Sequence, residues 1–202
     1  PTSALDVPSG PWWRERKGWW LKRLFDLSAS VAGLLVLGPL LALVALGIRI
    51  QMGSPVLFRQ ERPGYRGRPF ILRKFRTMRD PAPGEVWFRS DTERVTWLGR
   101  LLRRTSIDEL PQLINVLRGE MSLVGPRPAR PQEVRRYESW QHHRLAVKPG
   151  LTCTWQVSGR SDLSFETWMA MDLEYTRSWS NSGDIVLLLR TIPAVISMRG
   201  AW

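Results

Sequence analysis

The chain has 202 residues, a formal net charge of +12 and a sequence pI of about 11.2. This length suits one domain, with or without an appendage, and is sufficient for a hydrophobic core. The positive charge indicates anionic partners such as lipid headgroups, nucleotide phosphates or nucleic acid. The single cysteine, Cys153, excludes an intrachain disulfide and is typical of a reducing compartment.

The N-terminal region combines a polar lead-in with aromatic and basic residues. Residues 1–11 are rich in Pro, Ser and Gly, which predicts a disordered lead-in. Aromatic rings and cations then alternate, a mixture that suits the headgroup layer of a membrane, although scattered surface aromatics on a basic helix would give the same pattern. The residues concerned are Trp12, Trp13, Trp19 and Trp20 among Arg14, Arg16, Lys17, Lys22 and Arg23.

An uncharged, apolar stretch of 22 residues follows, from residue 27 to residue 48. As a helix it would be about 33 Å long, enough to cross a hydrocarbon core of about 30 Å. Pro39 interrupts it and basic residues flank both ends, so a helix bent there would return both ends to the cytoplasmic face. Because proline is also tolerated in spanning helices, the residues alone leave re-entrant and spanning arrangements open. A nucleic-acid binder has no need of such a stretch, and we expect no nucleic-acid partner.

Beyond residue 50 the pattern changes to short strands. Residues 56–58 and 70–72 are apolar and flank a basic loop, which predicts a β-hairpin. Three basic residues follow: Arg73, Lys74 and Arg76. Two interpretations are open, namely a solvated edge strand or side chains that bind phosphate.

Residues 92–104 and the stretch that follows contain the candidate site. Apolar residues on one side of 92–104, with arginines around them, predict a basic amphipathic helix. Asp108 and Glu109 come next, in a stretch that ends in Gly-Pro-Arg-Pro. Ser106 and Glu109 have the spacing of a capping box, whereas Pro111 favours a later helix start with Asp108 as the cap. Adjacent acids cannot straddle a sugar ring as a glycosidase pair does, but beside arginines they suit phosphoryl chemistry with Mg²⁺.

The C-terminal third is expected to alternate helices with one strand. Residues 130–145 predict a helix on which His142 and His143 are surface residues. Residues 151–158 alternate apolar and polar side chains, which predicts a strand with Cys153 in the core. The remaining predictions are a basic turn at 158–161 with Arg160, a helix at 165–179 with Asp172, and an interfacial or core helix at 184–198 that Pro193 breaks.

The block from residue 106 to residue 128 carries a resemblance to a known family. It reads Ser-Ile-Asp-Glu-Leu-Pro-Gln-Leu-Ile-Asn-Val-Leu-Arg-Gly-Glu-Met-Ser-Leu-Val-Gly-Pro-Arg-Pro and resembles the signature of the bacterial sugar transferases. These monotopic phosphoglycosyl transferases start exopolysaccharide, O-antigen and glycoprotein glycan assembly on a polyprenyl phosphate. The similarity extends block by block from about Lys22 to Pro193.

The chain departs from the family pattern at two places. The family has Ser-Pro at the break of a re-entrant membrane helix, whereas this chain has Gly38 before Pro39 and so lacks the serine hydroxyl. Residues 152–156 read Thr-Cys-Thr-Trp-Gln, where the commoner family version is Thr-Gly-Trp-Ala-Gln. The second departure leaves the part that this segment plays in substrate choice open.

The resemblance implies a reaction and roles for named residues. A sugar 1-phosphate would pass from a nucleoside diphosphate sugar, with uridine expected, to undecaprenyl phosphate, releasing UMP. Asp108 would be the nucleophile that carries a covalent phospho-sugar, and Glu109 would assist with Mg²⁺ or with deprotonation of the acceptor. Phosphate contacts are expected from Arg103, Arg127, Lys74, Arg76 and Arg160, and metal ligands from Asp108, Glu109 and Asp172.

Together these observations predict a mixed, mainly helical α+β fold. It would contain a small β-hairpin or sheet, interfacial amphipathic helices, and a re-entrant membrane helix within residues 12–50 that breaks at Gly38 and Pro39. Residues 51–202 would form a catalytic domain on the cytoplasmic face of the bacterial inner membrane. Its partners would be a nucleotide sugar, polyprenyl phosphate and an anionic bilayer, and a homodimer is compatible with the sequence. The alternative is a non-catalytic basic scaffold that binds anionic lipid.

Overall fold

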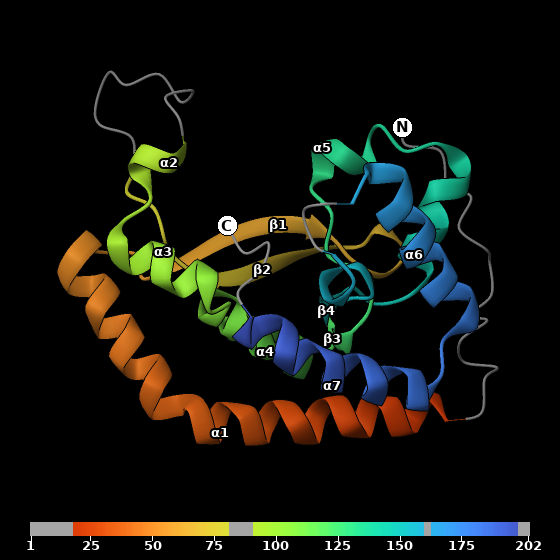
Figure 1. Cartoon of the computed structure of the whole chain (residues 1–202), viewed down its shortest axis with the longest axis horizontal. Coiled ribbons are helices and arrows are strands. Elements are labelled where there is room, and N and C mark those ends of the chain that lie inside the picture. The colour runs from red at the N-terminus through yellow and green to blue at the C-terminus, as the bar shows by residue number, and fades with distance from the viewer. Residues whose placement is uncertain (1–17, 81–90, 160–162, 198–202) are drawn as a thin grey trace.

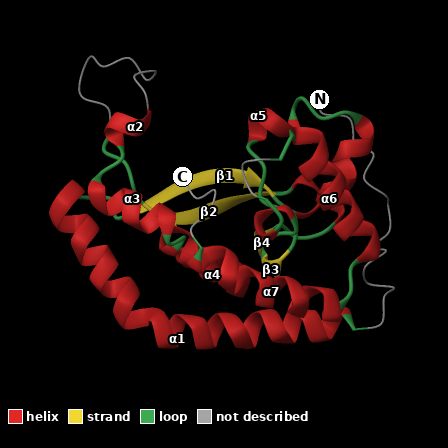
Figure 2. Ribbon diagram, in the orientation of Figure 1, coloured by secondary structure: helices red, strands yellow, loops and turns green. Residues whose placement is uncertain are grey.

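The computed structural model of the chain describes residues 18–80, 91–159 and 163–197 (Figure 1). The described part is mainly helical with small sheets, as predicted (Figure 2). The lead-in at residues 1–11, the tryptophans Trp12 and Trp13, and Arg160 lie outside the described residues. The helices are α1 Trp19–Met52, α2 Asp91–Arg94, α3 Trp97–Arg104, α4 Leu113–Leu117, α5 Pro131–Val134, α6 Phe165–Ser178 and α7 Asn181–Ile196. The strands are β1 Leu57–Pro63, β2 Pro69–Phe75, β3 Ser122–Val124 and β4 Gly150–Thr152.

Helix α1 contains the apolar stretch, and within the described residues it is the helix long and apolar enough to cross a membrane. Its large apolar side chains are mostly exposed: Leu35 is 74%, Val36 is 78% and Leu43 is 67% exposed. The core helix of a water-soluble domain buries such side chains, whereas a contiguous exposed apolar surface marks a site that meets a membrane or a partner.

Helix α1 is bent, and Pro39 lies inside it (Figure 1). Proline has no N–H for the carbonyl four residues earlier, and its ring clashes with that carbonyl, so it kinks a helix. A β-carbon added at Gly38 would meet nothing within 4 Å. Helix α1 nevertheless continues through Gly38 and Pro39 to Met52 as one bent helix (Figure 1).

The two halves of α1 pack against different hydrophobic clusters of the same domain. In the first half, Leu34 contacts the cluster that contains Val116. In the second half, Ile48 is fully buried against Phe75 and Leu102. The bent helix thus lies along one side of the domain, with both halves in contact with it (Figure 1).

Charged residues hold the first turns of α1. Lys22 Nζ lies 2.5 Å from Asp184 Oδ2, near the start of α7, and also donates to the Val124 carbonyl at 3.1 Å. Asp26 Oδ1 accepts a hydrogen bond from the Leu123 N–H at 3.1 Å. The beginning of α1 is thereby tied to α7 and to β3.

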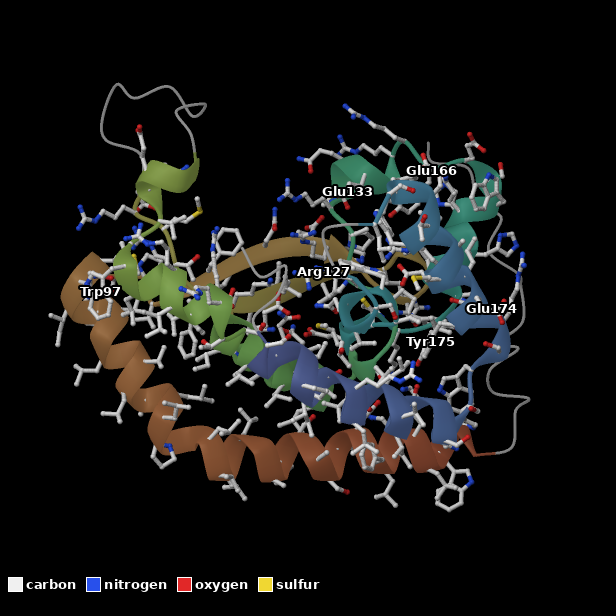
Figure 3. The ribbon with its side chains drawn as sticks, in the orientation of Figure 1. Trp97, Arg127, Glu133, Glu166, Glu174 and Tyr175 are labelled. Atoms are coloured by element: carbon white, nitrogen blue, oxygen red, sulfur yellow. The ribbon has the colours of Figure 1, made fainter. Side chains whose placement is uncertain are left out.

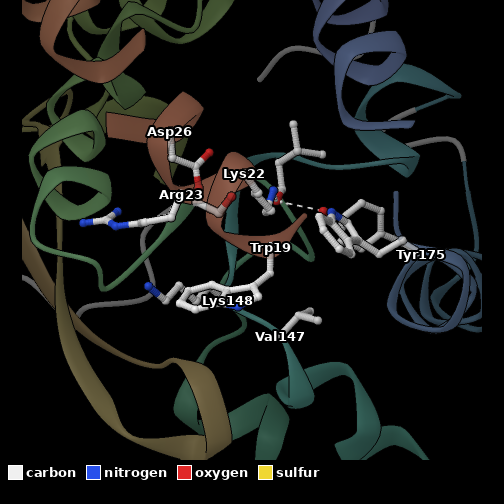
Figure 4. Close-up of a pocket in the computed structure, with 10 residues that line it drawn as sticks. Trp19, Lys22, Arg23, Asp26, Val147, Lys148 and Tyr175 are labelled. Carbon is white, nitrogen blue, oxygen red and sulfur yellow. Dashed lines mark hydrogen bonds between the residues drawn. The ribbon is translucent and has the colours of Figure 1, made fainter. Parts of the chain in front are cut away.

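Arg23 connects α1 to helix α4. Its Nη1 and Nη2 donate to the Val116 and Leu117 carbonyls at 2.6 Å and 2.9 Å. Because a helix leaves its last carbonyls without partners, Arg23 satisfies groups that α4 cannot pair itself. Arg23, Lys148 and Tyr175 are among the residues that line a cavity of about 60 Å³. Figure 4 shows these residues around it.

Strands β1 and β2 form the predicted hairpin, in an antiparallel register from Leu57 opposite Phe75 to Pro63 opposite Pro69. Side chains two residues apart share one face of a strand. Lys74 therefore shares the face of the buried residues Phe70 and Leu72, and its side chain is only 20% exposed. The Lys74 ammonium therefore lies in the interior, and the interpretation of a solvated edge strand does not hold for Lys74.

The prediction of one helix over residues 92–104 is wrong, because it divides into α2 and α3. Thr96 has extended backbone between them (φ −71, ψ 164), and its side chain accepts a hydrogen bond from the Gly99 N–H to cap α3. The prediction of a helix over residues 130–145 is also wrong. Only α5 and the 3₁₀ segment η3, Ser139–Ala146, form there, with extended backbone at Glu138 between them (φ −71, ψ 159).

Two further predictions for the C-terminal third are corrected. The strand expected over residues 151–158 ends at Thr152, because Thr154 turns helical and the 3₁₀ segment η4, Trp155–Val157, follows. Pro193 does not break α7, which continues to Ile196. The helix expected at 165–179 is confirmed as α6.

Candidate functional site

Glu109 lies at the centre of a cluster of charged residues. Its Oε1 lies 2.6 Å from Lys74 Nζ and 2.8 Å from Arg127 Nη2, and its Oε2 lies 3.4 Å from Arg127 Nη1. Figure 3 shows Arg127 between the β1–β2 hairpin and helix α6. The structure therefore brings together three residues that are far apart in the sequence, one carboxylate and two cations.

The segment that carries both acids is a 3₁₀ helix, η2, Ile107–Gln112, and becomes α-helical only at Leu113. Ser106 precedes it with left-handed backbone (φ 57, ψ 15), and its side chain makes no capping hydrogen bond. The predicted capping box is therefore wrong, and so is the alternative with Asp108 as the cap, because Asp108 lies inside the first turn. Pro111 has no N–H to donate within this segment.

Asp108 is 8% exposed, and among the described residues its carboxylate has no hydrogen-bond or ion-pair partner. Burial, and next the charge of Glu109, raises the pKa of Asp108 to about 6. The charges of Lys74, Arg103 and Arg127 act in the opposite direction. The result is a carboxylate that is ionised at neutral pH although burial opposes its charge.

Glu109 has the opposite electrostatic character. Burial by itself would raise its pKa, but the charges and hydrogen bonds of Arg127 and Lys74 hold the pKa of Glu109 well below its usual range. In return, the charge of Glu109 holds the pKa of Arg127 above its usual value, against the effect of burial. The two neighbouring acids thus differ in character: Glu109 is an anion held by two cations, and the carboxylate of Asp108 has no such partner among the described residues.

Arg103 approaches the site from α3. Its Nε donates to Thr77 Oγ1 at 3.0 Å. The helix can lie this close to the end of β2 because Gly99, one turn earlier, has no β-carbon. A β-carbon there would stand 2.0 Å from the Thr77 carbonyl oxygen. Gly99 therefore permits the close approach of α3 to Thr77, the residue that Arg103 contacts.

Arg76 is mainly occupied elsewhere. It is buried, donates to the Met78 and Ser54 carbonyls at 3.1 Å and 3.2 Å, and lies 2.6 Å from Asp80 Oδ2. None of these partners belongs to the cluster around Glu109. The structure places Arg76 where the end of α1 meets the end of β2.

Asp172 does not join the other two acids in a ligand set, since the described residues contain no group of three or more His, Cys, Asp or Glu side chains placed to hold a metal. It is fully buried, and its Oδ2 lies 2.5 Å from Arg144 Nη2. Arg144 was not predicted as a site residue, because it falls in the stretch expected to be a helix with His142 and His143 on the surface. No motif in the sequence indicates its partners.

The two carboxylates, without Asp172, are ligands of the type that Mg²⁺ takes. Asp108 has no partner among the described residues, and Glu109 Oε2 has only the 3.4 Å contact with Arg127. Mg²⁺ usually takes one or two protein carboxylates and completes its shell with water and phosphate oxygens.

Two acids of opposite character, set among cations beside a helix with an exposed apolar surface, are suited to an enzyme that acts on phosphate groups. Comparison with known proteins agrees: residues 17–198 match the model of the family described as bacterial sugar transferase. The chain belongs to the bacterial sugar transferase family and is a transferase.

Three relatives illustrate the similarity. The exopolysaccharide production protein ExoY of Sinorhizobium fredii is 40% identical over 198 residues, which cover 90% of this chain and 88% of the relative. The uncharacterized sugar transferase EpsL of Bacillus subtilis is 43% identical over 180 residues, which cover 89% of each. The undecaprenyl-phosphate glucose phosphotransferase of Komagataeibacter xylinus is 46% identical over 198 residues, which cover 90% of this chain but 37% of the relative.

Proposed function

We propose that this chain transfers a sugar 1-phosphate from a nucleoside diphosphate sugar, with uridine as the expected base, to polyprenyl phosphate. The observation that carries the proposal is the pair of unlike acids, Asp108 buried and unpaired among the described residues, and Glu109 held by two cations. The names of relatives such as the undecaprenyl-phosphate glucose phosphotransferase support the acceptor. The product would serve the first membrane step of polysaccharide assembly.

In the first half-reaction, one Asp108 oxygen attacks the phosphorus that bears the sugar. The bond from this phosphorus to the bridging oxygen breaks, and the nucleoside monophosphate leaves with the electron pair. The product is a phospho-sugar joined to Asp108 as a mixed anhydride. Splitting one transfer into two steps in this way predicts ping-pong kinetics.

In the second half-reaction, an oxygen of polyprenyl phosphate attacks the same phosphorus, and Asp108 leaves as a carboxylate. Because the acceptor phosphate is already ionised at neutral pH, this step needs no strong general base. The low pKa of Glu109 makes it a weak base, which favours an electrostatic role over deprotonation of the acceptor.

The cations around the acids bind phosphate in this proposal. Arg127 and Lys74 sit on Glu109, and Arg103 acts on Asp108 from α3, so a diphosphate that enters the site meets three positive groups. Fixed cations placed where negative charge develops lower the barrier of phosphoryl transfer. Mg²⁺ held by Asp108 and Glu109 would neutralise charge on the diphosphate and help the nucleotide leave.

We further propose that α1 enters the membrane and returns to the same face. Support comes from its bend, its exposed apolar surface and the packing of both halves on one domain. A straight crossing would separate Lys22 from Asp184, or Ile48 from Phe75, at opposite faces of the bilayer. The site would then face the cytoplasm at the depth of lipid headgroups, where a water-soluble donor and a lipid acceptor can meet.

The test uses purified protein in detergent with undecaprenyl phosphate, Mg²⁺ and a panel of nucleotide sugars. We expect release of a nucleoside monophosphate with at least one donor, and, without acceptor, a mass increase equal to one sugar phosphate. Asp108→Asn should abolish both signals, whereas Glu174→Gln, at an exposed acid on α6, should change neither. Activity in folded Asp108→Asn would overturn the nucleophile assignment. Lipid binding without turnover of any donor by the wild type would favour a non-catalytic scaffold.

A further inference from the structure

Arg144 joins helix α6 to the loop that carries Arg127, the residue that contacts Glu109. Its Nη1 donates to Tyr137 Oη at 2.6 Å, and its Nη2 donates to the Arg127 carbonyl at 2.9 Å and to Asp172 Oδ2 at 2.5 Å. The side chains of Arg144 and Asp172 are 2% and 1% exposed. This buried ion pair therefore links helix α6 to the loop that carries Arg127.

A requirement for stability does not explain this pair. Burying two charges costs several kcal/mol per ion, and apolar residues of similar size are often as stabilising. The pair is also incompletely satisfied, because Arg144 Nε has no hydrogen-bond partner among the described residues. A buried ion pair that leaves a polar atom unpaired calls for an explanation other than stability.

The loop of residues 126–128, which carries Arg127, is fixed through its main-chain carbonyls. Three successive carbonyls each accept a hydrogen bond: Pro126 from the Gly150 N–H at 2.9 Å, Arg127 from Arg144 at 2.9 Å, and Pro128 from Arg62 Nη1 at 3.1 Å. The two prolines have no N–H, so carbonyls are the main-chain groups through which they can be fixed.

Aromatic rings enclose the same residues. The Arg144 guanidinium lies 5.2 Å from the Trp168 ring and 5.8 Å from the Tyr137 ring, and the Arg127 guanidinium lies 6.0 Å from the Trp155 ring. The enclosure keeps water from replacing Arg144 as the donor to the Arg127 carbonyl.

We propose that Arg144 and Asp172 are positioning residues for the transfer reaction. Arg144 fixes the main chain of Arg127 so that its guanidinium meets both Glu109 oxygens, and Asp172 neutralises and orients Arg144. This inference rests on the proposed function and deepens it. It assigns Asp172 to Arg144 in place of the metal expected from the sequence.

The test separates positioning from stability by replacing the pair with apolar residues. In Arg144→Met/Asp172→Leu no unpaired charge is left in the core, so the protein should fold with a melting temperature close to that of the wild type. The donor to the Arg127 carbonyl is still missing, and a misplacement of about 1 Å at a reacting site costs roughly 100-fold in rate. We expect kcat/KM for the nucleotide sugar to fall about 100-fold.

A comparison with Arg127→Gln identifies the route of the effect. If Arg144 acts through Arg127, the triple variant should be no slower than Arg127→Gln alone, because residues that act as a unit are not additive. Tyr137→Phe is the matched control, since it removes one partner of Arg144 but leaves Asp172 and Arg127 in contact with it. It should retain activity within about threefold.

Three outcomes would overturn the positioning role. They are wild-type kcat/KM in the Met/Leu variant, losses that multiply in the triple variant, and a loss in Tyr137→Phe as large as in the Met/Leu variant. If the Met/Leu variant does not fold, Arg144→Lys decides, because it keeps the positive charge but ends short of the position of Nη2, the atom that donates to both Asp172 and the Arg127 carbonyl. Full activity in folded Arg144→Lys would also refute the proposal. Absence of turnover in the wild type would instead overturn the proposed function.

Discussion

Lys74 Nζ lies 2.6 Å from Glu109 Oε1, although 35 positions separate the two residues in the sequence. The lysine comes from the second strand of the hairpin and the glutamate from the 3₁₀ segment η2. Their side chains are only 20% and 15% exposed, so solvent and salt screen their interaction weakly. The hairpin therefore contributes one of the charges that decide how the two acids titrate.

The first prediction concerns Lys74. Because its charge lowers the pKa of Asp108, Lys74→Met should raise the pH below which activity is lost, by about one unit. The measurement is kcat/KM as a function of pH. Arg59→Met, at an exposed position on β1, is the control and should leave the profile unchanged. An unshifted profile in the Lys74 variant would show that this lysine does not act on the nucleophile.

The second prediction is the pH profile of the wild type. Asp108 must be ionised to attack phosphorus, and its pKa is raised to about 6. Activity should be constant above about pH 7 and fall tenfold per unit well below pH 6. A profile that stays flat down to pH 4 would contradict the assignment of Asp108, whose environment places its ionisation above that value.

The third prediction concerns stability. The pKa of Asp108 is 3.8 unperturbed and about 6 in the folded protein, so the folded state binds this proton more tightly than the unfolded state. Ionised Asp108 therefore opposes folding above pH 6, and the penalty disappears below about pH 4. Asp108→Asn should raise the free energy of unfolding by up to about 3 kcal/mol at pH 8 and hardly at all at pH 4.

Denaturation in detergent at the two pH values provides this measurement. Glu109→Gln is a control of opposite sign, because its folded-state pKa is depressed and its charge pairs with Lys74 and Arg127. It should destabilise the protein at pH 8. Equal effects of the two substitutions would refute the unlike character of the acids.

The fourth prediction concerns Gly99. A β-carbon there would stand 2.0 Å from the Thr77 carbonyl oxygen, which is a backbone atom that cannot move aside. Gly99→Ala should therefore push α3 away from β2, lower stability by about 1 to 3 kcal/mol and weaken donor binding through Arg103. Gly38→Ala is the contrasting change, since open space surrounds that position, and should cost nothing. Melting temperatures and KM for the donor test both.

The fifth prediction concerns membrane topology. Cys153 is 1% exposed, so the native thiol should not react, and single cysteines can report accessibility. Trp20→Cys and Arg59→Cys lie on either side of the apolar stretch, at exposed positions. A membrane-impermeant maleimide should label both from the cytoplasmic side of sealed vesicles. Labelling of the two sites from opposite sides would establish a spanning helix.

The sequence was most informative where a local pattern is sufficient. The apolar stretch, the hairpin and the helix at α6 follow from hydrophobic runs and periodicity. It failed where tertiary contacts override the local pattern. Residues 151–158 alternate like a strand, yet the chain turns at Thr154, and Arg144 enters the interior although arginine is usually exposed.

The same distinction between local pattern and tertiary contact applies to the candidate site. Adjacent acids and nearby arginines in the sequence predict phosphate chemistry, but not which acid is paired. That difference depends on Lys74 and Arg127, which strand pairing and the proline-flanked loop bring to Glu109. Asp172 was expected at the metal because the resemblance marks it as an active-site acid. Only the structure shows the arginine that occupies its carboxylate.

The contact of Arg23 with the end of α4 has a consequence for when the enzyme works. Helix α4 continues directly from the segment that carries both acids, and the residue that completes its end belongs to the helix with the apolar surface. If α1 lies in the membrane as proposed, a molecule that detaches from lipid would disturb α1 and, through Arg23, the segment that carries both acids. Nucleotide sugar would then be safe from wasteful breakdown wherever the lipid acceptor is absent.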